Sequence, residues 1–287
     1  MSKNIEIKVD NDFTPLPDDA PAKVVEAGNF TEVTTMKHQP NMKGLQNRVR
    51  LSKDEYVCTD TGEVKKYSKM LDRVDNPHLQ ETLKKIRLYI NTNFHRGGQF
   101  LTLCYDGCMT DFFKAKSDIN SFLKVLRKAY KGVEYIWVLE PKESGSWHVH
   151  MLTKKKKITA EKLQELWTHG CVDVQDIFDI KGLAYYLSPC YRKDVEAGEE
   201  KEVNEIDGID VLSKAKQKAE RLKFYPSGVR IYGKSNGIEK WKEIKTTRGE
   251  AETYVKGKRQ TGNITIKITE AETGKEVNQI NKEIFET

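Results

Sequence analysis

Two apolar segments joined by a short polar turn place the strongest constraint on the fold of this chain. Residues 133–140 and 147–152 each have the pattern of a β-strand, and residues 141–146 between them are polar and contain a glycine. A link this short joins neighbouring strands that run in opposite directions. The sequence therefore predicts a β-hairpin at the centre of an antiparallel sheet.

The order of the elements around this hairpin indicates the fold class. Apolar periodicity predicts strands and helices in the order β-α-β-β-α-β, which is typical of ferredoxin-like folds. The predicted elements are a strand at 100–105, a helix at 111–130, the two hairpin strands, a helix at 159–167 and a strand at 171–180, flanked by helices at 77–94 and 181–189. We therefore expect an α+β fold, with an antiparallel sheet of about five strands and helices mainly on one face.

The two ends of the chain differ from this central domain, which we place at residues 76–195. Residues 1–75 contain four prolines and lack sustained periodicity, so a mostly disordered leader is predicted. Residues 196–287 are predicted to form an accessory C-terminal region. A helix is expected there at 212–222, and β structure at 229–232, 254–255 and 264–268.

Charge is distributed unevenly along the chain, although the net charge of 287 residues is only +6. Residues 1–35 hold three lysines and seven acidic residues, whereas residues 84–157 hold fifteen Lys and Arg and six Asp and Glu. A basic central region favours a polyanionic partner such as nucleic acid, and the alternative is an ordinary solvated surface.

The five cysteines, at positions 58, 104, 108, 171 and 190, are odd in number and show no CxxC spacing. This pattern argues against a disulfide framework and a structural zinc site. With no apolar run of membrane-spanning length, we expect a soluble protein of the reducing cytoplasm that has no membrane partner.

The segment Trp147-His148-Val149-His150 carries the chemistry of the hairpin. Side chains alternate along a strand, so His148 and His150 project from the same face. Glu140 ends the preceding strand and is expected opposite His148, with cross-strand neighbours ~5 Å apart. Two imidazoles and one carboxylate suit a divalent ion such as Mg²⁺ or Mn²⁺. The alternative is a structural histidine pair.

A second feature is the tyrosine-rich stretch that contains Tyr185, Tyr186 and Tyr191. Aromatic residues on a helix are usually part of the core, and at least one of these tyrosines is expected there. A phenol becomes a competent nucleophile when a metal polarises the phosphate and a cation assists. Arg192 and Lys193 supply charge nearby, and Pro189 breaks the helix or starts a new segment.

These motifs resemble those of the rolling-circle replication initiators of bacterial plasmids and small single-stranded DNA phages, which are HUH (histidine-hydrophobic-histidine) endonucleases. Three blocks correspond in order, within residues 78–195. Phe100-Leu101-Thr102-Leu103 is similar to the first motif of the family. Glu140–His150 resembles the second, including its acidic ligand, and Gly182–Ser188 resembles the tyrosine helix.

The resemblance implies a metal held by Glu140, His148 and His150, and Tyr186 as the nucleophile that nicks origin DNA. It also implies a 5′-phosphotyrosine link and a 3′-OH primer. Pro189 and Cys190 stand where the family often has a lysine and a second tyrosine, which favours a single-tyrosine mechanism. Tyr185 and Tyr191 stay alternatives.

The expected substrate is single-stranded or hairpin origin DNA in a bacterial cytoplasm, with Lys154, Lys155, Lys156 and Lys157 binding its backbone. No GxxxxGK[ST] stretch occurs, so a host helicase is expected to unwind the DNA and a host DNA polymerase to extend the primer. The alternatives are a relaxase or single-tyrosine transposase of the same superfamily, and a non-catalytic nucleic-acid-binding module of ferredoxin-like fold.

Overall fold

The computed structural model describes most of the chain. The described residues are 5–10, 12–38, 48–52, 55–58, 64–66, 77–94, 98–154, 157–178, 183–184, 187, 221–226 and 228–287. The chain divides into two compact units. One consists of residues 26–29 and 72–242, and we call it the central unit; the other combines residues 1–25, 30–71 and 243–287, and we call it the terminal unit.

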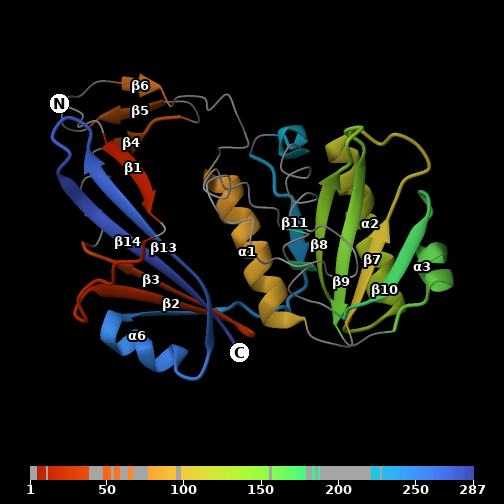
Figure 1. The fold of residues 1–287 in the computed structure, drawn as a ribbon. Helices are drawn as coiled ribbons and strands as arrows, with labels where there is room; N and C mark the ends of the chain where they lie inside the picture. The colour runs from red at the N-terminus through yellow and green to blue at the C-terminus, as the bar shows by residue number, and fades with distance from the viewer. Residues whose placement is uncertain are drawn as a thin grey trace. The chain divides into compact units, whose positions relative to one another are not determined.

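The central unit is built on a five-stranded antiparallel sheet, with strand order β10-β7-β9-β8-β11 (Figure 1). Its elements are α1 (Pro77–Asn93), β7 (Gln99–Leu103), α2 (Phe112–Ala129), β8 (Glu134–Pro141), β9 (Trp147–Lys154), α3 (Ala160–Leu166), β10 (Val172–Asp176), the 3₁₀ helix η3 (Arg221–Phe224) and β11 (Tyr232–Lys234). From β7 to β10 they follow the predicted β-α-β-β-α-β order, and β9 lies between β7 and β8, as in split β-α-β units. The predicted antiparallel sheet and its number of strands are confirmed.

The β8–β9 hairpin has the register that the sequence predicts, with Glu140 opposite His148 and Val138 opposite His150. Its turn is closed by Lys142 N–H, which donates to Ser146 O at 2.7 Å. Gly145 has a φ of +77°, a left-handed conformation in which a side chain would be strained. A Cβ at this position would also lie 3.2 Å from the Phe224 ring, so glycine suits the turn twice over.

Helices cover both faces of this sheet. The α2 face carries Trp147, whose ring lies 5.1 Å from that of Phe112 at the start of α2. The α3 end lies on the same face, since the Trp167 and Phe122 rings are 5.6 Å apart. The opposite face carries Lys154, which donates to Asn93 of α1 at 3.4 Å. Helices on one face are thus confirmed for α2 and α3, whereas α1 lies on the other face.

Helix α2 shows how local sequence fixes these elements. The Asp111 side chain caps the helix by accepting hydrogen bonds from the backbone N–H of Phe113 and Lys114. The residues that α2 buries recur every three or four positions, which gives one apolar face against the sheet. They are Phe112, Ala115, Ile119, Phe122, Leu123 and Leu126. No described helix is both long and apolar enough to cross a membrane.

The terminal unit contains a six-stranded sheet of order β1-β13-β14-β3-β2-β12 and a three-stranded sheet of order β4-β5-β6. Its elements are β1 (Ile5–Asp10), β2 (Pro21–Ala27), β3 (Phe30–Met36), β4 (Arg48–Arg50), β5 (Glu55–Cys58), β6 (Val64–Lys66), β12 (Lys242–Thr247), α6 (Arg248–Val255), β13 (Arg259–Glu270) and β14 (Glu276–Glu286). Its small core gathers Ala22, Val24, Val33 and Ala251.

The prediction of a mostly disordered leader is wrong for β1, β2 and β3, which form one sheet with strands from the C-terminal end of the chain. Ile7 lies opposite Ile268, and Val33 opposite Glu283. These strands bury small and β-branched residues and depend on partners over 200 residues away, a long-range pairing that local periodicity does not reveal.

Two predictions for the C-terminal region have different outcomes. The strand at 264–268 is confirmed as part of β13, whereas Tyr254 and Val255 belong to helix α6. The capping box of Thr247 and Glu250 starts a helix that reaches these residues and overrides their β propensity. Most of the predicted helix at 212–222 lies outside the described residues.

Two adjacent phenylalanines test the packing of the central unit. Phe112 is 3% exposed and contacts Trp147, whereas Phe113 is 66% exposed. Phe112→Ala should lower the free energy of unfolding by about 3–5 kcal/mol, because it leaves a cavity in the core. Phe113→Ala should change it by less than about 0.5 kcal/mol. Urea unfolding followed by tryptophan fluorescence measures both, and equal losses would contradict this packing.

Candidate metal centre

The hairpin register brings three ligand-type side chains together on one face of the central sheet. Glu140 lies in β8, directly opposite His148 in β9, and His150 follows two residues later on the same face. All three are largely buried, with exposed fractions of 7% for Glu140, 7% for His148 and 3% for His150. Strand alternation and cross-strand pairing therefore position the whole group.

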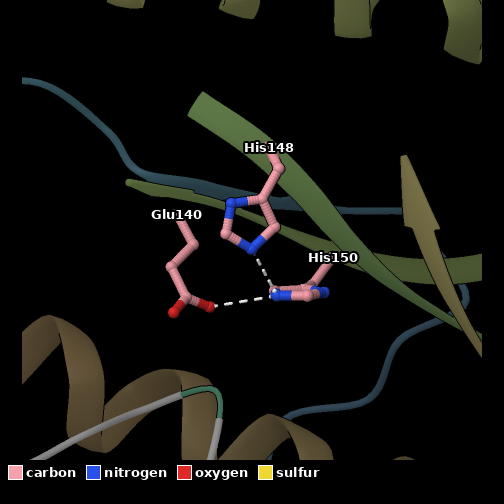
Figure 2. A group of neighbouring side chains, drawn as sticks. All are labelled: Glu140, His148 and His150. Atoms are coloured by element: carbon pink, nitrogen blue, oxygen red, sulfur yellow. Dashed lines mark hydrogen bonds and ion pairs between the residues drawn. The ribbon is translucent and has the colours of Figure 1, made fainter. Parts of the chain in front are cut away.

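The three side chains point toward one another (Figure 2). His150 Nε2 lies 2.8 Å from His148 Nε2 and 3.2 Å from Glu140 Oε2. The two imidazole rings are nearly perpendicular, with an interplanar angle of 87°. One nitrogen from each histidine and one carboxylate oxygen all lie within 4.8 Å of one another. The predicted convergence of these residues is present in the structure.

The neighbouring strand β7 holds His150 from its other side. Thr102 lies opposite His150, and its Oγ1 is 3.2 Å from His150 Nδ1. The Phe100 ring stacks on the same imidazole, with centroids 5.0 Å apart. The sequence motif predicted this strand, but the contact of Thr102 was missed. Its signal was the alternation that puts Phe100 and Thr102 on one face of β7.

This donor set fits a divalent cation. Two imidazole nitrogens and one carboxylate oxygen on a rigid sheet leave coordination positions open for a substrate oxygen. When Nε2 of His150 is the ligand atom, Nδ1 carries the proton and donates to Thr102, which fixes the ring and its tautomer as outer-shell partners of metal ligands do. The group can therefore hold a metal, and its donor types do not select among Mg²⁺, Mn²⁺ and Zn²⁺.

A small pocket at Glu140 connects the site with the end of the tyrosine-rich stretch. Leu83 of α1, Leu187 and Tyr225 line this pocket together with Glu140. Tyr225 is buried, and its hydroxyl donates to Leu139 O at 2.8 Å. Of the predicted tyrosine helix, Leu183, Ala184 and Leu187 are described and helical, and Ala184 and Leu187 are buried. Tyr185, Tyr186 and Tyr191 lie outside the described residues.

The lysines of the predicted DNA-binding loop differ in their surroundings. Lys154 is partly buried, forms an ion pair with Glu134 at 3.5 Å and donates to Asn93. Lys157 is exposed. Lys155 and Lys156 lie outside the described residues, so the structure places two of the four predicted lysines.

His169 and Tyr105 belong to a different cluster, on the α2 side of the sheet. His169 Nε2 is 4.0 Å from Asp118 Oδ1, and the Tyr105 hydroxyl donates to Asp118 Oδ2 at 3.3 Å. Burial, followed by the charge of Asp118, raises the pKa of the Tyr105 phenol well above its usual value. Tyr105 is thus held protonated and away from the metal centre, which makes it a poor nucleophile.

The metal centre predicts a specific pattern of cation binding. His148→Ala, His150→Ala and Glu140→Gln should each weaken Mn²⁺ binding at least about 100-fold, since loss of a ligand should exceed the 10–100-fold loss seen for outer-shell partners. His169→Ala should bind Mn²⁺ like the unmodified chain, because His169 lies in the other cluster. Calorimetric titration measures the affinities. Retained binding in the His150 variant would rule out this site.

Comparisons with known proteins agree with the motifs at the level of a family. Curated proteins give no significant match to the chain. Among solved structures, the hypothetical protein ORF119 from Sulfolobus islandicus rod-shaped virus 1 is 16% identical, covers 42% of this chain and 98% of its own, and has a TM-score of 0.26. The N-terminal nuclease domain of non-structural protein 1 of Minute virus of mice is 10% identical, covers 85% of this chain and 80% of its own, and has a TM-score of 0.16.

TM-scores this low do not establish a shared fold with either protein. The family model is more informative, because the segment that it matches contains all three motif blocks and the whole Glu140, His148 and His150 group. Residues 98–194 match the Replication-associated protein ORF2 family, which confirms the resemblance of this segment to replication initiators.

Proposed function

We propose that this protein starts DNA replication by nicking one strand at an origin, through a metal-assisted attack by a tyrosine. The observation that carries the proposal is the buried convergence of Glu140, His148 and His150 inside a segment that matches a replication-associated family. A structural histidine pair would not require a carboxylate in register on the adjacent strand.

In the proposed reaction, Glu140, His148 and His150 hold a divalent cation, Mg²⁺ or Mn²⁺. The cation supplies Lewis-acid polarisation of the scissile phosphate. Thr102 and Phe100 keep the His150 ring oriented, so that a ligand atom does not have to be reorganised during the reaction. The buried position of the group limits access of bulk water to the phosphate.

We assign the attack to Tyr186. Its phenolic oxygen forms a bond to phosphorus while the bond from phosphorus to the 3′ oxygen breaks. The products are a 5′-phosphotyrosine link and a 3′-OH, and the proton lost by the phenol ends on the 3′ oxygen. Leu187, the next residue in the chain, lines the pocket with Glu140, which supports a nucleophile in this part of the sequence.

Single-stranded or hairpin origin DNA is the proposed substrate. The ligand group is almost completely buried, so a phosphate reaches it more easily from an isolated strand than from a duplex. The 3′-OH would be extended by a host DNA polymerase, with strand separation by a host helicase in a bacterial cytoplasm. A relaxase or a transposase of the same superfamily would share the chemistry of the nick.

Covalent trapping tests the proposed reaction. A randomised pool of single-stranded oligonucleotides, labelled at the 3′ end, is incubated with the protein and Mn²⁺ and resolved on a denaturing gel. A 5′-phosphotyrosine keeps the 3′ label on the protein, whereas a 5′ label leaves with the 3′-OH product. Tyr186→Phe should abolish the adduct with little change in stability, because it removes only the attacking oxygen. EDTA should also abolish it.

The controls locate the nucleophile. Tyr185→Phe, Tyr191→Phe and Tyr225→Phe keep the aromatic ring and should retain adduct formation. If Tyr191→Phe or Tyr225→Phe loses the adduct while Tyr186→Phe keeps it, the enzyme class stands and the assignment of Tyr186 is wrong. If the unmodified protein gives no adduct with either label, nicking by a tyrosine is rejected in favour of a non-catalytic binding module.

The contrast between Lys154 and Lys157 gives a test of the basic loop. Lys157→Gln should weaken binding to all DNA sequences alike and lower the slope of log affinity against log salt by about 0.7 for a single-strand contact. Lys154→Gln should change the slope less, because Lys154 is paired with Glu134. Fluorescence anisotropy across a salt series measures both slopes. A loss confined to one DNA sequence would make the loop a base reader.

A further inference from the structure

A cluster of tyrosines and cations lies at the β11 edge of the central sheet. The Arg230 guanidinium stands 5.1 Å from the Tyr232 ring, and Lys234 Nζ stands 5.1 Å from the Tyr89 ring. The two tyrosine rings are themselves 6.4 Å apart. Stacking of this kind holds a cation in place while its outer N–H groups stay available to a ligand.

These cations occur on the same face of the sheet as the metal centre. Tyr232 pairs with Val138, and Val138 pairs with His150, so the three side chains form one row across β11, β8 and β9. At ~4.8 Å between strands, Tyr232 and His150 are roughly 10 Å apart along this row. Lys234 points to this same face, since Gly233 between them lies against the Trp137 ring on the other face.

Pairing of this edge continues past β11 toward Arg230. Leu139 N–H donates to Ile231 O at 2.9 Å, which keeps the chain against β8 beyond Tyr232. Arg230 precedes Ile231 and is exposed. The guanidinium is therefore carried on a hydrogen-bonded edge of the sheet, beside the strand that contains Glu140.

The charges of this edge are not neutralised by carboxylates of the described chain. Arg230 and Lys234 form no ion pair with any described acidic residue, and Lys234 donates to the backbone carbonyl of Ile238 at 3.0 Å. Lys85 of α1 and Lys154 differ, since they pair with Glu81 and Glu134. Two fixed cations without an internal counter-charge suit an anionic ligand.

We propose that Arg230 and Lys234, held over Tyr232 and Tyr89, bind the phosphate backbone of the single DNA strand next to the metal centre. This inference rests on the proposed nicking function, because it names the surface that holds the substrate of that reaction. A flexible single strand can follow the sheet edge and place one phosphate at the buried ligand group. The half-buried rings below the cations are also a platform of the kind that tolerates any base sequence.

Binding without catalysis tests the surface. The full chain is titrated against fluorescent oligo-dT in EDTA over a range of salt concentrations, so that neither the cation nor the nucleophile contributes. Arg230→Gln/Lys234→Gln should lower the slope of log affinity against log salt by about 1.4, which is two contacts at 0.7 each. Arg230→Lys/Lys234→Arg preserves both charges and should keep the slope of the unmodified chain.

A matched control carries the same change of charge elsewhere. Lys124 in α2 and Lys131 in the turn after it are exposed and belong to the other side of the sheet. Lys124→Gln/Lys131→Gln should keep the slope and the affinity of the unmodified chain. An equal loss in both double variants would show a general charge effect and overturn the proposal. Overlapping thermal melts of the variants show that the fold is retained.

Other ligands provide the remaining outcomes. Loss of affinity for duplex DNA or RNA with unchanged affinity for oligo-dT would overturn the proposal in favour of that other ligand. The adduct assay separates this inference from the nicking function. Weak binding by the Gln double variant, with adduct formation restored at saturating DNA, supports the surface. Absence of any adduct rejects nicking, whereas the binding result in EDTA still decides the surface.

Discussion

The pairing of β8 with β9 is the interaction on which the proposed chemistry depends. Glu140 and His148 face each other because eight residue pairs run in register from Glu134–Lys154 to Pro141–Trp147. A slip of one residue would move Glu140 to the opposite face from the histidines, since side chains alternate along a strand. The hairpin turn therefore determines the ligand geometry, with Gly145 allowing its left-handed conformation. Fold and site are specified by the same few residues.

Neighbouring elements convert this register into a defined site. Strand β7 supplies Thr102 and Phe100 against His150, and α1 supplies Leu83 at the pocket beside Glu140. The α2 face of the sheet holds Trp147 and its aromatic neighbours, so its role is to support the strands from the opposite side. A sheet with one face given to packing and the other to chemistry can tolerate polar ligands without loss of its core.

The sequence predicted the central sheet and the ligand group because both depend on short-range patterns. Alternation gave the strands, the six-residue link gave the hairpin, and the two together put Glu140 opposite His148. The N-terminal strands escaped prediction for the opposite reason. Val24 and Val33 sit in a small core completed by Ala251, so their burial depends on residues far along the chain. Thr102 was missed because its contact needs the pairing of β7 with β9, and no local pattern specifies which strands are neighbours.

The same reasoning explains why the cations at the sheet edge are visible in the structure alone. In the sequence, Arg230 and Lys234 belong to the region after the third motif, about 80 residues from the histidines, and nothing links them to the metal centre. Pairing of β11 with β8 brings Tyr232 into the row of Val138 and His150. An edge strand is the place where such a link is useful. Its outer side is open to a ligand, and its inner side is fixed to the strand that carries Glu140. Substrate positioning and metal binding would then share one rigid sheet, so that the distance between a bound phosphate and the ligand group varies little.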